Sequence, residues 1–184
     1  GILGKKDGKY VLTNKGKEFA NRFDTEKVAI EKQAKVTLIV VPIKKVGKKV
    51  YRLVHCRLKQ PYYGYYGAIT GKIRWGEKVL EAAARELLEE TGLKVEKATL
   101  LGVFHKSDYS LEKTLLEDKY FFMVRVDKFS GKLIENVPEG KNVWMTEKEL
   151  LANPMRFKDL DDFVGYWQKD GFNFVEKNYT VEGY

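Results

Sequence analysis

The segment 71–93, which reads GKIRWGEKVLEAAARELLEETGL, constrains this chain of 184 residues more than any other stretch. Residues 78–91 combine three successive alanines with several leucines and glutamates and contain neither glycine nor proline, so they are predicted to form a helix. The acidic Glu77 suits the positive end of the helix dipole, and Gly92 suits the position just past the last turn. The segment is therefore predicted to fold as a loop, a helix and a second loop.

One face of this predicted helix is apolar and the nearly opposite face is acidic. The spacing i, i+4, i+7, i+11 makes one packing face of Leu80, Ala84, Leu87 and Thr91. The spacing i, i+3, i+4 brings together the carboxylates of Glu86, Glu89 and Glu90. Like charges at this spacing destabilise a helix by about 0.2–0.5 kcal/mol per pair. Crowded carboxylates suit a hard cation such as Mg²⁺ or Mn²⁺, so we predict that this face binds metal.

The segment resembles the Nudix box, a 23-residue pattern of glycine, glutamate, arginine, glutamate, an aliphatic residue, two glutamates, glycine and an aliphatic residue. All nine specified positions match in this sequence. The resemblance implies an α+β fold, the Nudix α/β/α sandwich with a mixed β-sheet and the Nudix loop–helix–loop. It also implies a divalent-metal-dependent enzyme that hydrolyses the diphosphate linkage of a nucleoside diphosphate derivative.

The resemblance further implies roles for individual residues of the box. Glu86, Glu89 and Glu90 are expected to hold Mg²⁺ or Mn²⁺ together with the carbonyl oxygen of Gly71. Arg85 is expected to hold Glu77 or another carboxylate in place. The general base that activates water is left open between Glu89 and a group outside the box. The candidates outside the box are Glu112, Glu117 and Asp118.

Aromatic residues around the box are candidates for contacting the substrate. The run 61–67, PYYGYYG, places four tyrosines just before the box, and Trp75 lies inside its first loop. An aromatic ring can stack on a nucleobase. Tyrosines before a strand more often cover a sheet edge, and packing is the favoured interpretation of Trp75. We single out three residues as substrate-binding candidates, namely Tyr66, Trp75 and Glu117.

Composition and charge bound the setting of the protein. Cys56 is the single cysteine, so an internal disulfide is excluded and a cytoplasmic location is expected. No apolar run is long enough to span a bilayer, so no membrane partner is expected. Residues 1–60 carry a net charge of +11 and residues 61–184 a net charge of −3. This asymmetry fits either a nucleic acid partner or ordinary solvated lysines.

The first residues differ in pattern from the rest. Asp7-Gly8 is a turn signal, residues 9–12 are predicted to be a short strand, and Thr13 is placed to cap a short helix through residues 15–20. The run KKDGKYVLTNKGKEFANRF resembles the wing hairpin and following helix that end a winged-helix DNA-binding domain. The alternative is an ordinary hairpin packed on the main domain. We divide the chain into residues 1–35, interpreted as a winged-helix remnant, and residues 36–184, the Nudix domain.

The remaining chain is predicted to alternate strands with short helices. Strands are expected at residues 36–42, 50–58, 68–70, 95–105, 118–126 and, as the last strand, 143–145. The polar residues 106–117 are predicted to be a loop beside the site. Thr146 and Glu149 form a capping box for a helix over residues 147–152, and residues 159–169 are predicted to be the closing helix. The aromatic tail from residue 171 onward is expected to dock on the domain.

Three functions are compatible with these patterns. The favoured one is a Mg²⁺-dependent hydrolase of nucleotides, because the box retains all three carboxylates that catalysis requires. A transcription regulator that senses a nucleotide is the alternative supported by the wing-like stretch. The third hypothesis, an RNA-binding or decapping protein, is supported only by the basic character of the first 60 residues. Whether the chain forms a homodimer is left open.

Overall fold

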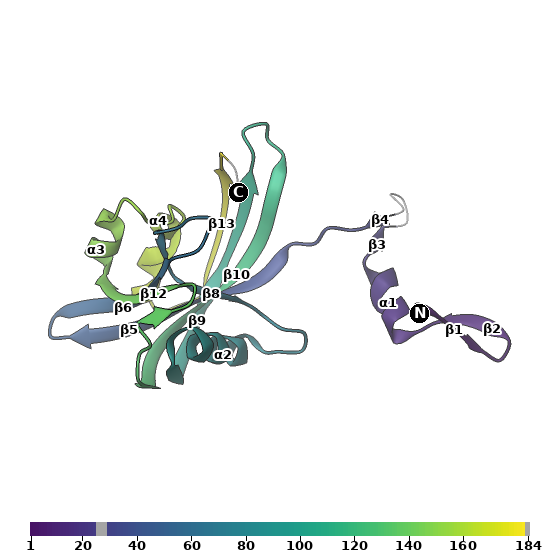
Figure 1. The fold of residues 1–184 in the computed structure, drawn as a ribbon, viewed down its shortest axis with the longest axis horizontal. Helices are drawn as coiled ribbons and strands as arrows, with labels where there is room; N and C mark the ends of the chain where they lie inside the picture. Colours follow the sequence, from purple (N-terminus) through teal and green to yellow (C-terminus); the bar gives the residue numbers. More distant parts are fainter. Residues whose placement is uncertain (25–28, 183–184) are drawn as a thin grey trace. The chain divides into compact units, whose positions relative to one another are not determined.

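A computed structural model describes residues 1–24 and 29–182 and divides the chain into two compact units, Gly1–Gln33 and Ala34–Tyr184 (Figure 1). The boundary lies two residues before the one predicted from the sequence. Within the described residues, no helix is both long enough and apolar enough to cross a membrane.

The smaller unit begins with a hairpin followed by a capped helix. Strands β1 (Leu3–Lys6) and β2 (Lys9–Leu12) pair antiparallel around a turn in which Asp7 and Gly8 both have positive φ, as two-residue hairpins prefer. Helix α1 (Asn14–Asn21) follows, and the Thr13 hydroxyl accepts a hydrogen bond from the Gly16 amide at 3.1 Å. The predicted hairpin and cap are confirmed. The resemblance to a winged-helix domain remains a prediction.

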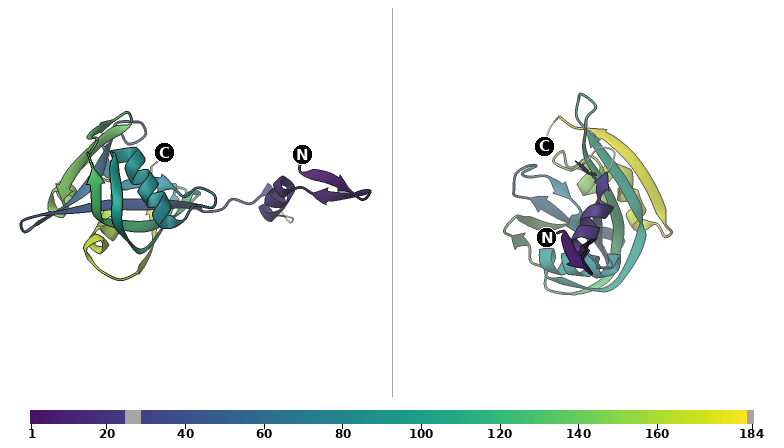
Figure 2. Two further views of the ribbon diagram at one scale, coloured as in Figure 1. Left: turned by 90° about the horizontal axis from the view of Figure 1, so that it is seen from below. Right: turned by 90° about the vertical axis from the view of Figure 1, so that its right-hand side faces the viewer.

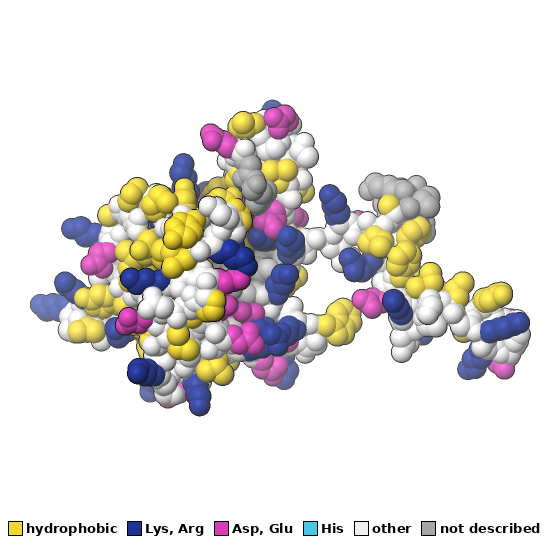
Figure 3. All heavy atoms as spheres, viewed as in Figure 1, with side chains coloured by type: hydrophobic (Ala, Val, Ile, Leu, Met, Phe, Trp, Pro, Cys, Tyr) yellow, Lys and Arg dark blue, Asp and Glu magenta, His cyan; other side chains and the backbone are white. Residues whose placement is uncertain are grey.

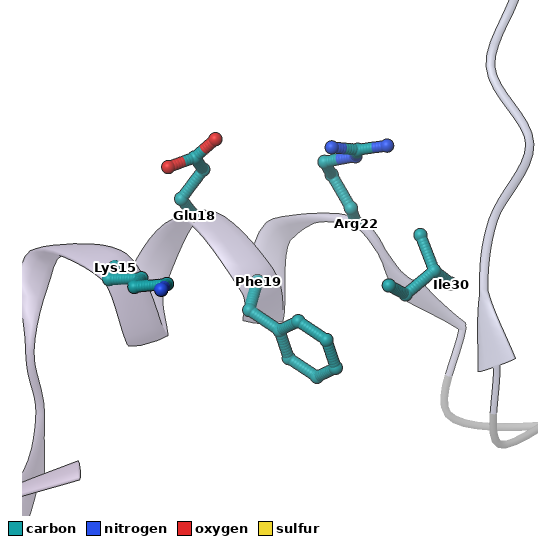
Figure 4. A pocket seen from close by; sticks show the side chains of 5 residues that line it. All are labelled: Lys15, Glu18, Phe19, Arg22 and Ile30. Carbon is teal, nitrogen blue, oxygen red and sulfur yellow. The ribbon is translucent and has the colours of Figure 1, made fainter. Parts of the chain in front are cut away.

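A short strand pair, β3 (Phe23–Asp24) and β4 (Ala29–Ile30), follows α1. The ring of Phe19 stacks on that of Phe23 with centroids 5.7 Å apart. Phe19 also lines a shallow hollow with Lys15, Glu18, Arg22 and Ile30, in which Glu18 and Arg22 lie together on one side of the helix and Phe19 on the other (Figure 4).

The larger unit is built on a mixed β-sheet between two helical layers (Figures 1 and 2). Across the sheet, the strands are β11 (Asn136–Val137), β12 (Gly140–Thr146), β6 (Lys49–Arg57), β5 (Lys35–Val46), β10 (Leu115–Gly131), β9 (Leu93–Tyr109) and β13 (Asn173–Thr180). β10 runs parallel to β5, β13 runs parallel to β9, and the other neighbours are antiparallel. Two short strands, β7 (Tyr66–Gly67) and β8 (Ile69–Lys72), pair with β6 and β5.

Alternate residues of the central strand β5 face opposite layers, which is how one sheet supports two cores. Leu38 and Val40 face helix α2 (Val79–Thr91). Ile39 and Val41 face helices α3 (Glu147–Ala152) and α4 (Leu160–Phe163) and the 3₁₀ helix η1 (Val164–Gln168). These three layers confirm the α/β/α sandwich.

The packing face predicted for α2 is partly wrong. Leu87 and Thr91 are buried as expected, but Leu80 is 46% exposed and Ala84 is only half-buried. Ala82 and Ala83 pack against the sheet instead. Alanine is compatible with either a buried or an exposed face of a helix. Three successive alanines therefore did not distinguish between two orientations of α2 about its own axis, one that buries Leu80 and one that buries Ala82 and Ala83.

The prediction of a loop over residues 106–117 is also wrong, because β9 and β10 extend through most of it as one long hairpin. Lys106 pairs with Lys119, Ser107 with Asp118 and Asp108 with Glu117. The polar character of these residues suggested a loop. In the paired strands, polar side chains form hydrogen bonds across the hairpin. The Ser107 hydroxyl, for example, donates to Asp118 Oδ1 at 3.0 Å.

Two predictions for residues 143–180 are also wrong, namely the last strand and the closing helix. Residues 143–145 lie in β12, and the last strand is β13, formed by the aromatic tail. The closing helix predicted over residues 159–169 is a short α4 followed by η1. The predicted docking of the tail and the capping box between Thr146 and Glu149 are confirmed. Four residues of the segment 159–169, Leu160, Phe163, Val164 and Trp167, are buried.

His105 on β9 lies between a carboxylate of β13 and a carboxylate of β10 and binds both. Its Nε2 lies 2.7 Å from Asp118 Oδ1 on β10, its Nδ1 lies 3.0 Å from Glu176 Oε1 on β13, and its ring stacks on Tyr120 at 4.1 Å. Burial lowers the pKa of His105, but the hydrogen bonds that its ring makes to Glu176 and Asp118 outweigh burial, so the pKa is raised overall. The protonated ring donates to both carboxylates.

We expect this contact to make stability depend on pH. A group whose pKa is raised by folding contributes its full stabilisation below its ordinary pKa of about 6.5 and loses it as the pH rises through the folded value. The free energy of unfolding of the wild type minus that of His105→Gln should therefore fall as the pH rises above about 6.5. Urea unfolding of both proteins on either side of this pH measures the difference. A difference that is constant or rises with pH would contradict the assignment.

Candidate functional site

The ends of α2 fix the direction in which its acidic side chains point. At the first turn, Glu81 Oε2 accepts a hydrogen bond from the Lys78 amide at 3.2 Å. At the last turn, Gly92 adopts φ 73° and donates to the Leu88 carbonyl at 2.9 Å. The glycine predicted at this end is therefore used as expected.

Arg85 is the centre of the acidic cluster. Its Nε and Nη2 donate to the two oxygens of Glu77 at 2.7 and 2.8 Å, which is a bidentate pair. Its Nη1 donates to Glu86 at 2.7 Å and to Glu89 at 3.1 Å, and its Nη2 also reaches the Lys72 carbonyl at 3.0 Å. The hydrogen bonds from Arg85 lower the pKa of Glu77 to about 2, so Glu77 stays ionised at neutral pH.

Glu86 lies directly against the strand that precedes the loop. Its side chain is 12% exposed, and a Cβ added at Gly71 would lie 2.0 Å from Glu86 Cδ. Any side chain at position 71 would displace this carboxylate, so the glycine is required here for space. β8 holds Gly71 opposite Leu38 of the central strand β5, which anchors this contact to the sheet.

Glu89 and Glu90 lie nearer the C-terminal end of α2. Glu89 is 47% exposed and also accepts a hydrogen bond from Arg74 Nη2 at 3.2 Å. The backbone carbonyl of Glu90 accepts a hydrogen bond from Asn142 Nδ2 at 2.8 Å. The buried Asn142 also donates to the Ile134 carbonyl at 2.8 Å and so ties the end of α2 to the sheet. Sequence reasoning missed Asn142, because an asparagine within a strand gives no signal of a partner 52 residues away.

The loop before α2 contains a tight turn. The Glu77 amide donates to the Arg74 carbonyl at 3.0 Å, the Arg74 amide donates to Glu77 Oε2 at 2.9 Å, and Gly76 has φ 79°. Trp75 lies within this turn and is 99% exposed. The interpretation of Trp75 as a packing residue is therefore wrong, because the turn directs its side chain into solvent.

The other substrate candidates lie in different surroundings. Tyr66 lies in β7, where it pairs with Cys56 of β6, and its side chain packs against the core. Glu117 lies in β10, where Lys35 and Lys119 approach its oxygens to 2.6 and 2.5 Å. Of the candidate bases outside the box, Asp118 binds His105 and Ser107, and Glu112 lies at the hairpin tip. Tyr66 therefore lies on β7 and Glu117 and Asp118 on β10, whereas the carboxylates of the box lie on α2.

Two tyrosines of the run 61–67 join a small aromatic cluster. Tyr62, Tyr65 and Phe157 contact one another with ring centroids 5.2–5.7 Å apart. Phe157 was not singled out from the sequence, because it lies in a segment with no periodic pattern. Tyr62 and Tyr65 therefore pack against another aromatic side chain of the protein.

Comparison with known proteins decides the family. A family model described as the NUDIX domain matches residues 34–164 of this chain. The chain belongs to the Nudix family. Its match to the "Uncharacterized Nudix hydrolase YvcI" of Bacillus subtilis is 31% identical over 98 residues, which is 53% of this chain and 61% of that relative. Its match to the "Oxidized purine nucleoside triphosphate hydrolase" of Danio rerio is 28% identical over 121 residues, which is 61% of this chain and 74% of that relative.

Solved Nudix structures agree with this assignment. The mutator MutT protein of Bacillus halodurans superposes with a TM-score of 0.66 at 26% identity, covering 79% of this chain and 90% of that protein. The Nudix domain of Shewanella oneidensis NrtR superposes with a TM-score of 0.63 at 15% identity, over 84% of this chain and 96% of that domain, which shows a shared fold.

Nudix hydrolases in general need a divalent metal, and the candidate donors here are the carboxylates of the Nudix helix. Within residues 1–24 and 29–182, no three His, Cys, Asp or Glu side chains already converge on a common point. Glu86 and Glu89 both accept from Nη1 of Arg85, so a cationic group already lies between them. The donors are carboxylates, which hard divalent cations prefer, and Glu89 is exposed enough to rotate. The residues therefore fit such a metal.

Proposed function

We propose that this Nudix protein hydrolyses the diphosphate linkage of a nucleoside diphosphate derivative with Mg²⁺ or Mn²⁺. The observation that carries the proposal is the cluster in which one Arg85 guanidinium binds three carboxylates of the Nudix box, those of Glu77, Glu86 and Glu89. A helix that needed only to be soluble would intersperse lysines among them. The activity named for the Danio rerio relative belongs to the same reaction class and supports the proposal.

Residues of the Nudix box have two roles in this proposal, metal binding and the positioning of other side chains. Glu86, Glu89 and Glu90, with the Gly71 carbonyl, would hold the metal. A bound divalent ion neutralises phosphate oxygens and lowers the pKa of a coordinated water. Arg85 keeps Glu77 ionised and fixes the side chains of Glu86 and Glu89 relative to the loop.

Glu89 is also our candidate for the general base, a role that it would take in place of a position among the metal ligands. Its 47% exposure leaves room for a water molecule, and its helix position places it beside Glu86. The water oxygen attacks phosphorus, Glu89 accepts the proton, and the P–O bond of the anhydride breaks. The products are a nucleoside monophosphate and a phosphorylated leaving group.

A screen of nucleoside diphosphate derivatives by mass spectrometry tests the proposal. Purified protein is incubated with each compound in Mg²⁺, in Mn²⁺ or in excess chelator, and the phosphorylated products are identified. We expect cleavage at the anhydride with metal and none with chelator. Cleavage that is unaffected by chelator, or no cleavage across the panel in either metal, would overturn the proposal.

Nucleic-acid binding is a second candidate function, favoured by one observation. The turn end of the β1–β2 hairpin exposes Lys5, Lys6 and Lys9, and basic side chains gather there in Figure 3. Three lysines at a hairpin tip give a salt-dependent contact to phosphates. The intact carboxylate cluster argues that such binding would accompany hydrolysis rather than replace it.

Removing residues 1–33 separates these two functions. The larger unit has its own two-sided core, so we expect residues 34–184 to fold and to keep hydrolysis within about twofold. Any binding to single-stranded or duplex oligonucleotides should be lost at the same time. Circular dichroism, turnover on a small nucleotide and fluorescence anisotropy with labelled oligonucleotides make the comparison. An unfolded product would mean that the first residues are part of the main domain.

A further inference from the structure

The C-terminal end of α2, where Glu89 and Glu90 lie, is held by hydrogen bonds from residues outside the helix. The final carbonyl groups of a helix have no hydrogen-bond partner within it. The Glu90 carbonyl accepts from Asn142 Nδ2 at 2.8 Å, and the Thr91 carbonyl accepts from the Ile134 amide at 2.8 Å. Asn142 lies on β12 and is 2% exposed, so β12 reaches the end of the helix through the interior of the domain.

The orientation of the Asn142 amide follows from its partners. Nδ2 donates to two backbone carbonyls, those of Glu90 and Ile134, at 2.8 Å each. A carbonyl can only accept, so these bonds use both N–H groups and leave Oδ1 as the accepting atom. Oδ1 lies 3.0 Å from Nδ1 of His55, the residue paired with Asn142 between β12 and β6. Nδ1 of His55 therefore carries a proton and donates a hydrogen bond to Asn142.

The imidazole of His55 occupies space that a glycine leaves open. A Cβ added at Gly140 would lie 2.0 Å from His55 Nε2 and 2.3 Å from its Cε1. The ring therefore lies with one edge over Gly140 and Nδ1 at Asn142. These three residues form a continuous series of contacts that ends at the backbone of Glu90, and we call Gly140, His55 and Asn142 the sheet clamp.

Apolar packing alone does not fix the position of α2 along its own axis. The helix packs on the sheet partly through small side chains, including those of Ala82 and Ala83. Burial of apolar area is non-directional, whereas a hydrogen bond restricts both distance and angle. The sheet clamp adds such a directional bond at Glu90, one helical turn beyond Glu86.

We propose that the sheet clamp positions the metal site, with Asn142 fixing Glu90 relative to Glu86 and His55 fixing Asn142. The inference rests on the proposed function, in which Glu86 and Glu90 hold Mg²⁺ or Mn²⁺. Asn142 and His55 are positioning residues that act through the backbone of Glu90. A divalent ion needs its ligands at defined distances, so losing a partner that orients a ligand typically costs about 10- to 100-fold in metal affinity.

Binding of Mn²⁺ in the absence of substrate tests the first step. Electron paramagnetic resonance measures the free ion and gives Kd for the wild type and for each variant. Asn142→Asp keeps the size of the side chain and an acceptor for His55, but it cannot donate to the Glu90 carbonyl. It should weaken Mn²⁺ binding about 10- to 100-fold. Turnover that is lost at low metal concentration should be recovered at high concentration, which a loss of folded protein would not give.

A pair of substitutions at His55 tests the second step. Asparagine and leucine have nearly the same shape, but only asparagine can donate to Asn142 Oδ1. His55→Leu should weaken Mn²⁺ binding between about twofold and tenfold, the range expected for one hydrogen bond. His55→Asn should bind Mn²⁺ nearly as tightly as the wild type. Both variants keep Asn142, so this pair decides the question even if circular dichroism shows that Asn142→Asp is unfolded.

Val143→Ala is the control for a general loss of stability. Val143 follows Asn142 on β12 but packs against the core of the opposite layer, which contains α3 and α4. This variant should lower the melting temperature and leave the Mn²⁺ affinity unchanged.

Three results would overturn the inference and leave the proposed function standing. They are wild-type Mn²⁺ affinity in folded Asn142→Asp, equal affinities in His55→Leu and His55→Asn, and a loss in Val143→Ala as large as that in Asn142→Asp. A wild-type protein that does not bind Mn²⁺ would instead overturn both the inference and the metal-dependent function.

Discussion

Replacing Glu90 with glutamine is expected to lower the turnover number about 100-fold, because stabilisation of the transition state by metal is worth several kcal/mol and each ~1.4 kcal/mol is tenfold in rate. The substitution keeps the length and helix propensity of the side chain and removes one negative charge. Relief of repulsion from Glu86 should leave the metal-free protein as stable as before or slightly more so. The bond from Asn142 is retained, since it goes to the backbone carbonyl of residue 90.

Turnover numbers and thermal melts with and without Mg²⁺ make this measurement. Glu81→Gln is the matched control on the same helix, because glutamine can still accept the hydrogen bond from the Lys78 amide. Glu86→Gln should also lose activity, although it removes an ion pair with Arg85 as well. Near-full activity in Glu90→Gln, with a large loss in Glu81→Gln, would place the metal on a different face of the helix.

Replacing Gly71 with alanine is expected to reduce activity at least tenfold in a protein that still folds. The new Cβ would lie 2.0 Å from Glu86 Cδ, so the carboxylate must move away from the strand. Glu86 is a flexible side chain, which allows it to move without unfolding the sheet. A displacement of about 1 Å at a catalytic group can cost about 100-fold in rate.

Gly165→Ala is the control for this change, because a Cβ there meets no atom within 4 Å and the backbone has no positive φ. It should keep full activity and stability. Measuring kcat for both variants, with circular dichroism for folding, tests the expectation. Full activity in Gly71→Ala would show that the position of Glu86 against the strand is unimportant for catalysis.

Local signals made the Nudix helix and its ends predictable from the sequence. Helix propensity, the position of Gly92 and the nine box positions all concern residues within one segment. The capping box at Thr146 and the hairpin at Asp7-Gly8 are likewise encoded within a few residues. Such features depend on neighbours in the chain, so a sequence pattern is enough to find them.

What the sequence did not reveal depends on distant partners. The polar strands around Ser107 and Asp118 are stabilised by pairing across the hairpin, and β13 forms because β9 offers it an edge. Asn142 acts on Glu90 across 52 residues, and Trp75 is exposed because of how Glu77 is anchored to Arg85. No periodicity in the sequence reports on contacts of this kind.

The docking of β13 on β9 also bears on how the protein is synthesised. The ribosome releases residues 173–180 only after both β9 and β10 have emerged, so one edge of β9 stays unpaired until this segment follows. Unpaired backbone N–H and C=O groups along an edge are a template for another chain. Chains that stop before residue 173 should therefore aggregate, and nascent chains in which β13 has not yet emerged should depend on chaperones.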